Sequence, residues 1–121
     1  MKQLIYLDNA ATTKTRPEVV EAMLPYFTEH YGNPSSVYDF STPCKKAMAH
    51  TREVIAGSLG ASENEIYFTN GGTEADNWAL FGVMRALKGK NHIITTQIEH
   101  HAILNACAAL ESLGYDVTYV P

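Results

Sequence analysis

Residues 92–120 read HIITTQIEHHAILNACAALESLGYDVTYV, and the alternation within this stretch decides the fold class. Residues 92–96 are a short β-branched and apolar run that is typical of a strand. Apolar side chains then recur at helical spacing over residues 100–113, and Gly114 supplies a helix stop. Residues 117–120 are a second strand-like run. This order predicts a βαβ unit with two parallel strands.

The same alternation begins earlier in the chain. Residues 66–68 (Ile-Tyr-Phe) are a short apolar run that predicts a further strand. Residues 73–87 are largely apolar and predict a helix, in which we expect Trp78 to belong to the core. Together these segments predict an α/β protein with a mainly parallel sheet flanked by helices.

The amino-terminal half carries helix signals but no strand alternation. Pro17 suits the first turn of a helix, whereas Pro25 should split the helical run that follows it. A second helix should open near Ser41 and stop at Gly60.

These patterns divide the chain into two parts. Residues 1–60 are expected to form a loop and a helical segment, and residues 61–121 the first strand–helix–strand units of a larger domain. The sequence stops at Pro121, directly after a predicted strand. Because a parallel sheet of about three strands usually has further strands and helices on both faces, we expect the chain to be a fragment.

Composition excludes several classes of protein. The 121 residues include 13 Asp and Glu against 9 Lys and Arg, so a nucleic-acid-binding protein with a basic stripe is not expected. No apolar run reaches the roughly 20 residues of a membrane span. Two cysteines are too few for a disulfide framework and favour a reducing cytoplasm. We expect Cys107 to be a small core residue and Cys44 to be structural or incidental.

The turn at residues 69–74 (Thr-Asn-Gly-Gly-Thr-Glu) is the first candidate site. Two adjacent glycines directly precede a predicted helix at Thr73, where free N–H groups and the positive end of the helix dipole favour an anion such as phosphate. The alternative is a tight turn in which Thr73 only caps the helix. Neither a dinucleotide fingerprint nor a P-loop is present.

The turn containing Glu99, His100 and His101 is the second candidate. Short right-handed crossovers would place it at the same sheet edge as the glycine turn. An imidazole at His100 could stack on a planar ligand or move a proton near neutral pH, although a solvated or capping histidine is the plainer alternative. Adjacent histidines point in different directions, so no metal site is expected.

Four motifs in order make the sequence similar to a known family. The chain resembles the amino-terminal third of NifS/IscS-type cysteine desulfurases, in the class V aminotransferase group of pyridoxal-phosphate enzymes. The resemblance covers the whole chain. The motifs that carry it are YLDNAATT at 6–13, GNPSS at 32–36, FTNGGTEADN at 68–77 and ITTQIEHHAIL at 94–104.

This resemblance implies a fragment of the fold-type-I large domain and assigns roles to individual residues. Gly72 and Thr73 match the positions that bind the phosphate of pyridoxal 5'-phosphate. His100 matches the histidine that stacks on the cofactor ring and assists proton transfers. The loop that lines the substrate mouth of the family matches Asn9, Ala10 and Ala11.

The sequence also departs from the family. Tyr38 and Ser41 stand where relatives often have His and Gly. The family's Schiff-base lysine, its aspartate at the pyridine nitrogen and its sulfur-accepting cysteine are expected beyond residue 121. Neither Cys44 nor Cys107 matches that cysteine, so this chain alone is expected to be inactive.

The resemblance implies a parent enzyme that converts L-cysteine to L-alanine. Its persulfide sulfur would be delivered to iron–sulfur cluster or thio-cofactor assembly. A homodimer, a sulfur-accepting scaffold protein and a cytoplasmic location are expected with it. Alternatives are another class V enzyme, such as a selenocysteine lyase or a small-amino-acid transaminase, and a non-catalytic phosphate-binding or interaction module.

Overall fold

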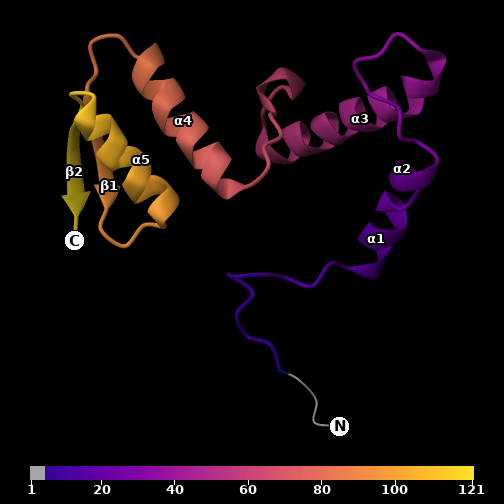
Figure 1. The fold of residues 1–121 in the computed structure, drawn as a ribbon, viewed down its shortest axis with the longest axis horizontal. Helices are drawn as coiled ribbons and strands as arrows, with labels where there is room; N and C mark the ends of the chain where they lie inside the picture. Colours follow the sequence, from indigo (N-terminus) through magenta and orange to yellow (C-terminus); the bar gives the residue numbers. More distant parts are fainter. Residues whose placement is uncertain (1–4) are drawn as a thin grey trace. The chain divides into compact units, whose positions relative to one another are not determined.

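The computed structural model describes residues 5–121, which form two compact units (Figure 1). The first unit ends at Ile66 and the second runs from Tyr67 to Pro121. The first contains α1 (Pro17–Met23), α2 (Pro25–Thr28), the short 3-10 helix η1 (Asp39–Ser41), α3 (Thr42–Leu59) and a second 3-10 helix, η2 (Glu63–Glu65). The second contains α4 (Gly72–Ala86), β1 (His92–Thr96), α5 (His101–Ser112) and β2 (Asp116–Val120).

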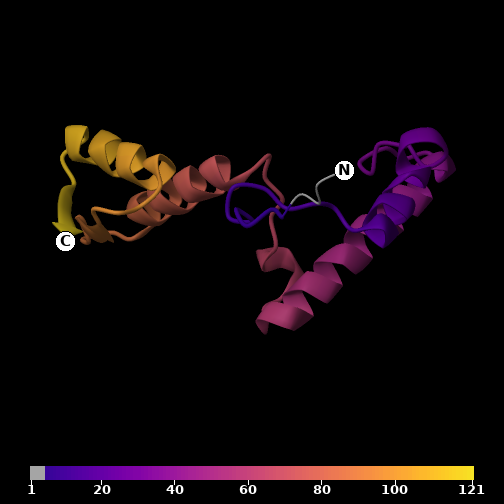
Figure 2. The same cartoon turned by 90° about the horizontal axis from the view of Figure 1, so that it is seen from below.

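Proline and glycine set the helix boundaries of the first unit as expected. Pro25 separates α1 from α2, because it cannot donate an N–H and its ring crowds the preceding turn. α3 ends at Gly60, which has a left-handed backbone with φ of 66°. The Ala61 N–H then donates to the Ala56 carbonyl at 2.9 Å, which satisfies one of the last helical carbonyls. Figure 2 shows η2 beside this end of α3.

Ser41, one of the departures from the family pattern, is buried at the start of α3. Its side chain is only 1% exposed. A Cβ built on Gly32 would lie 2.9 Å from the Ser41 Cα and 3.0 Å from both the Phe40 carbonyl oxygen and the Ser41 Oγ. The chain therefore passes so close to the start of α3 that only glycine fits at position 32.

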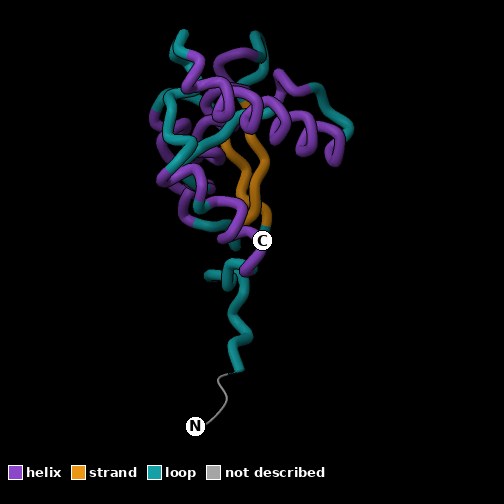
Figure 3. The backbone as a smooth tube through the Cα atoms, turned by 90° about the vertical axis from the view of Figure 1, so that its right-hand side faces the viewer, coloured by secondary structure: helices purple, strands orange, loops and turns teal. Residues whose placement is uncertain are grey.

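The predicted βαβ unit is confirmed in the second unit. β1 and β2 pair in parallel, from His92 opposite Asp116 to Thr96 opposite Val120 (Figure 3). The core cluster takes Met84 from α4, Ile93 from β1, and Cys107 and Leu110 from α5. Helices α4 and α5 therefore pack together on one face of the sheet, and Ile94, which alternation points to the other face, is exposed.

The prediction of a strand at residues 66–68 is wrong in the structure, where the sheet of the described residues has two strands. The backbone of Ile66 bonds locally instead: its N–H donates to the Glu63 carbonyl at 3.3 Å, and its carbonyl accepts from the Arg52 Nε at 3.4 Å. These bonds tie Ile66 to η2 and α3, so it belongs to the first unit. The assignment of residues 61–121 to one large domain stays a prediction.

Trp78 is half exposed, so its predicted core position is wrong for the residues described. α4 turns Leu80, Phe81 and Met84 toward the core instead. Trp78 makes an edge-to-face contact with Tyr67, with ring centroids 5.1 Å apart. Cys107, by contrast, is fully buried as predicted.

Candidate functional site

The first turn of α4 presents backbone N–H groups without helical partners. Gly71 is the N-cap, and the Ala75 N–H, which donates to the Gly71 carbonyl at 3.2 Å, closes the first turn. The preceding N–H groups, on Gly72, Thr73 and Glu74, have no carbonyl one turn earlier in the helix to accept from them. Together with the positive end of the helix dipole, they form a cluster of donors suited to an anion.

An open hollow of about 460 Å³ lies at this helix start. Its lining consists of Asn70, Gly71, Gly72, Thr73, Glu74 and Asn77. A Cβ built on Gly71 or Gly72 would meet no heavy atom within 4 Å. Packing among the described residues therefore does not require glycine at either position. The missing side chains leave the backbone open to close approach by a ligand.

Side chains around the hollow hold the turn in place. Glu74 Oε2 accepts from the Asn70 backbone N–H at 2.7 Å and from Asn70 Nδ2 at 3.1 Å. The Thr69 hydroxyl donates to the Gly71 carbonyl at 3.1 Å, and Asn77 Nδ2 donates to the Thr73 carbonyl at 2.8 Å. These roles were not predicted from the sequence. The signal available for Glu74 was a glutamate three residues after a helix cap, as in half of a capping box.

His100 caps the next helix of the second unit. Its backbone is extended, and its Nδ1 accepts from the Ala102 backbone N–H at 3.1 Å. In the neutral ring, this bond requires the proton to sit on Nε2. The residue is exposed, so Nε2–H is a hydrogen-bond donor available to a ligand.

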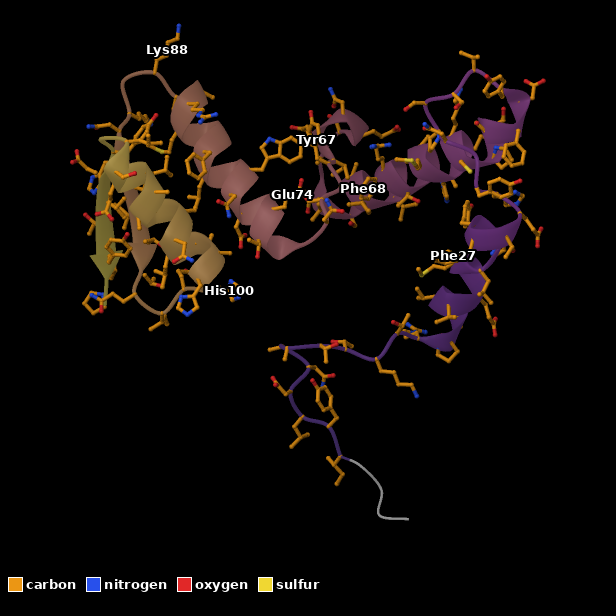
Figure 4. The ribbon with its side chains drawn as sticks, in the orientation of Figure 1. Phe27, Tyr67, Phe68, Glu74, Lys88 and His100 are labelled. Carbon is orange, nitrogen blue, oxygen red and sulfur yellow. The ribbon has the colours of Figure 1, made fainter. Side chains whose placement is uncertain are left out.

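The two candidate turns lie at the same end of the second unit. Figure 4 shows Glu74 at the start of α4 and His100 at the start of α5. Both helices begin at the end to which the β2 arrow points in Figure 1. The Gln97 N–H donates to the Val120 carbonyl at 2.9 Å, which ties the turn before α5 to this end of the sheet. Gly72, Thr73 and His100 are therefore presented at the carboxyl-terminal end of the parallel strands.

Asn9, Ala10 and Ala11 belong to the first unit, in an exposed turn. The Ala11 N–H donates to the Asp8 carbonyl at 3.1 Å, and the Thr13 hydroxyl donates to the Asn9 carbonyl at 3.1 Å. These bonds order the loop locally.

Both cysteines of the chain are buried, with their thiols unpaired. Burial, with smaller contributions from Glu111 and Glu99, raises the pKa of the Cys107 thiol. The Cys44 thiol donates to the His30 carbonyl at 2.9 Å. Neither arrangement is that of an accessible thiolate nucleophile.

Among residues 5–121, no three His, Cys, Asp or Glu side chains gather in a way that could hold a metal ion. No helix in the same range combines the length and the apolar character needed to cross a membrane.

Comparison with known protein sequences gives consistent matches along the chain. Residues 5–121 match the family described as aminotransferase class-V. The cysteine desulfurase IscS of Methanosarcina thermophila is 58% identical over 118 residues, which cover 97% of this chain and 29% of that protein. The cysteine desulfurase IscS of Clostridium botulinum (strain Kyoto / Type A2) is 57% identical over 122 residues, covering 100% and 31%. The chain thus spans less than a third of these curated relatives.

Solved structures agree with the sequence matches. A structure described as a NifS-like protein superposes with a TM-score of 0.89 at 42% identity, over 97% of this chain and 32% of that one. A structure described as SspA in complex with cysteine gives a TM-score of 0.86 at 41% identity, over 95% and 33%. The α/β fold is therefore that of NifS-like enzymes. With the family match extending from residue 5 to residue 121, the chain belongs to the class-V aminotransferases.

Proposed function

We propose that this chain is the amino-terminal part of a cysteine desulfurase, which converts L-cysteine to L-alanine and retains the sulfur as an enzyme-bound persulfide. The observation that supports the proposal is that α4, which begins at Gly72, and α5, which begins directly after His100, start at the same end of the second unit. The relatives named cysteine desulfurases, at 57–58% identity, and the related structure solved with cysteine support the choice of substrate.

The residues at the start of α4 fit the cofactor of the family, pyridoxal 5'-phosphate. Its phosphate group needs several hydrogen-bond donors and room for close approach. The N–H groups of Gly72 and Thr73 and the Thr73 hydroxyl supply the donors, and the open space beside Gly71 and Gly72 supplies the room. When bound, the cofactor supplies an electron sink for reactions at the α-carbon of an amino acid.

We assign His100 two tasks in this enzyme. Its flat ring would stack on the cofactor, and its Nε2 would hold or move a proton close to the reacting amino acid. The bond from the Ala102 N–H to Nδ1 fixes the ring orientation and leaves the proton on Nε2 in the neutral state. With this bond intact, Nε2–H is a hydrogen-bond donor to the bound ligand, and the ring can give up a proton from Nε2 only after Nδ1 has itself taken up a proton.

The remaining assignments follow from the family. Asn9, Ala10 and Ala11 would line the mouth through which cysteine enters. We further propose a cytoplasmic homodimer that passes sulfur to a scaffold protein for iron–sulfur cluster or thio-cofactor assembly. The support for this pathway is the name IscS shared by the two relatives above.

The test uses the purified full-length protein that contains these residues, with pyridoxal phosphate and a reducing thiol. We expect L-cysteine to yield equal amounts of sulfide and L-alanine. Thr73→Ala should weaken cofactor affinity by about tenfold, since one donor to a charged group is lost, whereas Thr73→Ser should retain it.

Product analysis separates the alternatives. Activity confined to selenocysteine would indicate a lyase of that specificity, and alanine formed only with an oxo-acid acceptor would indicate a transaminase. Absence of cofactor binding and turnover would favour the non-catalytic module and contradict the proposal.

A further inference from the structure

We infer that Glu74 is a positioning residue: its carboxylate holds Asn70 so that the first-turn N–H groups of α4 face the hollow. The inference rests on the proposed function, because the group to be received there is the cofactor phosphate. Glu74 was not among the residues assigned from the sequence or from the family resemblance.

Glu74 forms two hydrogen bonds with Asn70 across the glycine turn. A single carboxylate oxygen, Oε2, accepts from both the backbone N–H and the side-chain amide of Asn70, at 2.7 and 3.1 Å. These two bonds tie the residue before the N-cap to the third residue of the helix. They therefore fix the direction in which the chain enters α4.

Glu65 at the start of η2 makes a similar bond, but there the N-cap residue has a side chain, whereas the N-cap of α4 is glycine. At η2, Glu65 Oε2 accepts from the Ser62 backbone N–H at 2.7 Å, and the Ser62 side chain reciprocates toward the Glu65 N–H. That arrangement is a complete capping box. At α4 the N-cap is Gly71, which has no side chain to reciprocate. The backbone is thus held by its glutamate, while the first-turn N–H groups stay available to a ligand.

Electrostatics exclude a direct role for the Glu74 charge in attracting the phosphate. A carboxylate in the lining of an anion site repels the anion. Glu74 therefore contributes through the geometry of its two bonds with Asn70. A neutral side chain that keeps an acceptor at the same place should serve nearly as well.

The experiment compares two ligands on the full-length protein freed of its cofactor. Pyridoxal phosphate and pyridoxal share the ring, and only the former carries the phosphate. Glu74→Ala should raise the Kd for pyridoxal phosphate about tenfold and change the Kd for pyridoxal by less than about twofold. Glu74→Gln should stay within about threefold of wild type for both ligands. Glu21→Ala, which removes an exposed carboxylate from α1, is the matched control and should change neither.

A donor–acceptor exchange tests the same contact without relying on alanine. Asn70→Asp places a carboxylate against Glu74 and should weaken pyridoxal phosphate binding by at least about tenfold. Adding Glu74→Gln to Asn70→Asp supplies an amide donor to the new carboxylate and should restore most of the affinity. This exchange remains decisive if Glu74→Ala fails to fold.

The outcomes separate this inference from the proposed function. The inference is wrong if Glu74→Ala leaves phosphate-dependent affinity unchanged, if it weakens both ligands equally, or if the exchanged pair is not restored. In those cases a wild-type protein that binds pyridoxal phosphate and releases sulfur from cysteine leaves the proposed function standing. A wild-type protein that binds neither ligand overturns both.

Discussion

The Nδ1 atom of His100 accepts a hydrogen bond from the backbone N–H of Ala102 at 3.1 Å. One side chain thereby caps α5 and presents Nε2–H at the exposed end of the second unit. Helix stability and the proposed chemistry consequently depend on different nitrogens of the same ring.

Because capping uses Nδ1 and the proposed chemistry uses Nε2, the His100→Asn and His100→Ala variants should differ in stability but lose activity to a similar extent. His100→Asn keeps a capping acceptor, whereas His100→Ala removes it and should cost about 1 kcal/mol of unfolding free energy. Both should lower kcat/KM for L-cysteine by about 10²–10⁴-fold, because each removes the proton-carrying ring. Urea unfolding and sulfide release measure the two effects. Near-normal turnover in either variant would contradict the assignment of His100.

Gly72→Ala should separate binding from folding at the glycine turn. The new Cβ meets no heavy atom of the described chain within 4 Å, and alanine suits a helical position better than glycine. We expect stability to be unchanged or higher by up to about 1 kcal/mol. The Kd for pyridoxal phosphate should rise at least about tenfold, because the methyl group occupies space that the phosphate needs. An unchanged Kd would show that the phosphate does not bind here.

Gly32→Ala and Gly57→Ala should have opposite effects on stability. A Cβ at Gly32 would lie 2.9 Å from the Ser41 Cα and 3.0 Å from the Phe40 carbonyl oxygen, both backbone atoms that cannot rotate away. We expect a loss of about 1–3 kcal/mol. Gly57 lies inside α3 with open space around it, so alanine there should add about 0.5–1 kcal/mol.

The control for the Gly32 effect is Ser41→Gly in the Gly32→Ala background. Removing the Ser41 side chain should not restore stability, because the backbone contacts remain. Thermal unfolding of the single and double variants measures this, and full recovery would show that only the Ser41 hydroxyl opposes the methyl group.

The Cys107 thiol should make the protein less stable at alkaline pH. Burial raises the pKa of this thiol in the folded state. The unfolded thiol begins to lose its proton at about pH 8.5 while the folded thiol keeps it, so the unfolded state binds fewer protons and stability falls as pH rises. This contribution is fully present below about pH 8.5.

Chemical unfolding at about pH 7 and about pH 9.5 tests the effect before tyrosine ionisation dominates. Cys107→Ala should be less stable at both pH values, because it leaves a cavity beside Leu110. Its stability should nevertheless fall less between the two pH values than that of wild type. Equal losses in the two proteins would contradict a role for this thiol.

Much of the second unit could be predicted from the sequence. The boundaries of β1, α5 and β2 follow from apolar periodicity and from the helix stop at Gly114, whose φ is 91°. Residues 66–68 show the limit of this reasoning, because a strand also requires a neighbouring backbone with which to pair, and Ile66 bonds to Glu63 and Arg52 instead.

The candidate site could be predicted only in part. The glycines and the histidine are visible as turn residues at helix starts. A capping role for His100 was one of the alternatives that the sequence left open, and the bond from the Ala102 N–H was needed to select it because histidine is not among the preferred capping residues. The contact between Asn70 and Glu74 could not be predicted from the sequence. Its two hydrogen bonds end on the same Glu74 oxygen, and this geometry depends on the conformation of the turn between the two residues.

The contact between Tyr67 and Trp78 bears on the entropy of ligand binding. The two ring centroids are 5.1 Å apart. Tyr67 precedes the glycine turn and Trp78 follows it, so their contact joins the two ends of the segment that lines the hollow. A loop with joined ends has already lost much of its conformational freedom. The phosphate that we propose to bind at Gly72 and Thr73 would then have little chain to order, and more of the hydrogen-bond energy would be retained as affinity.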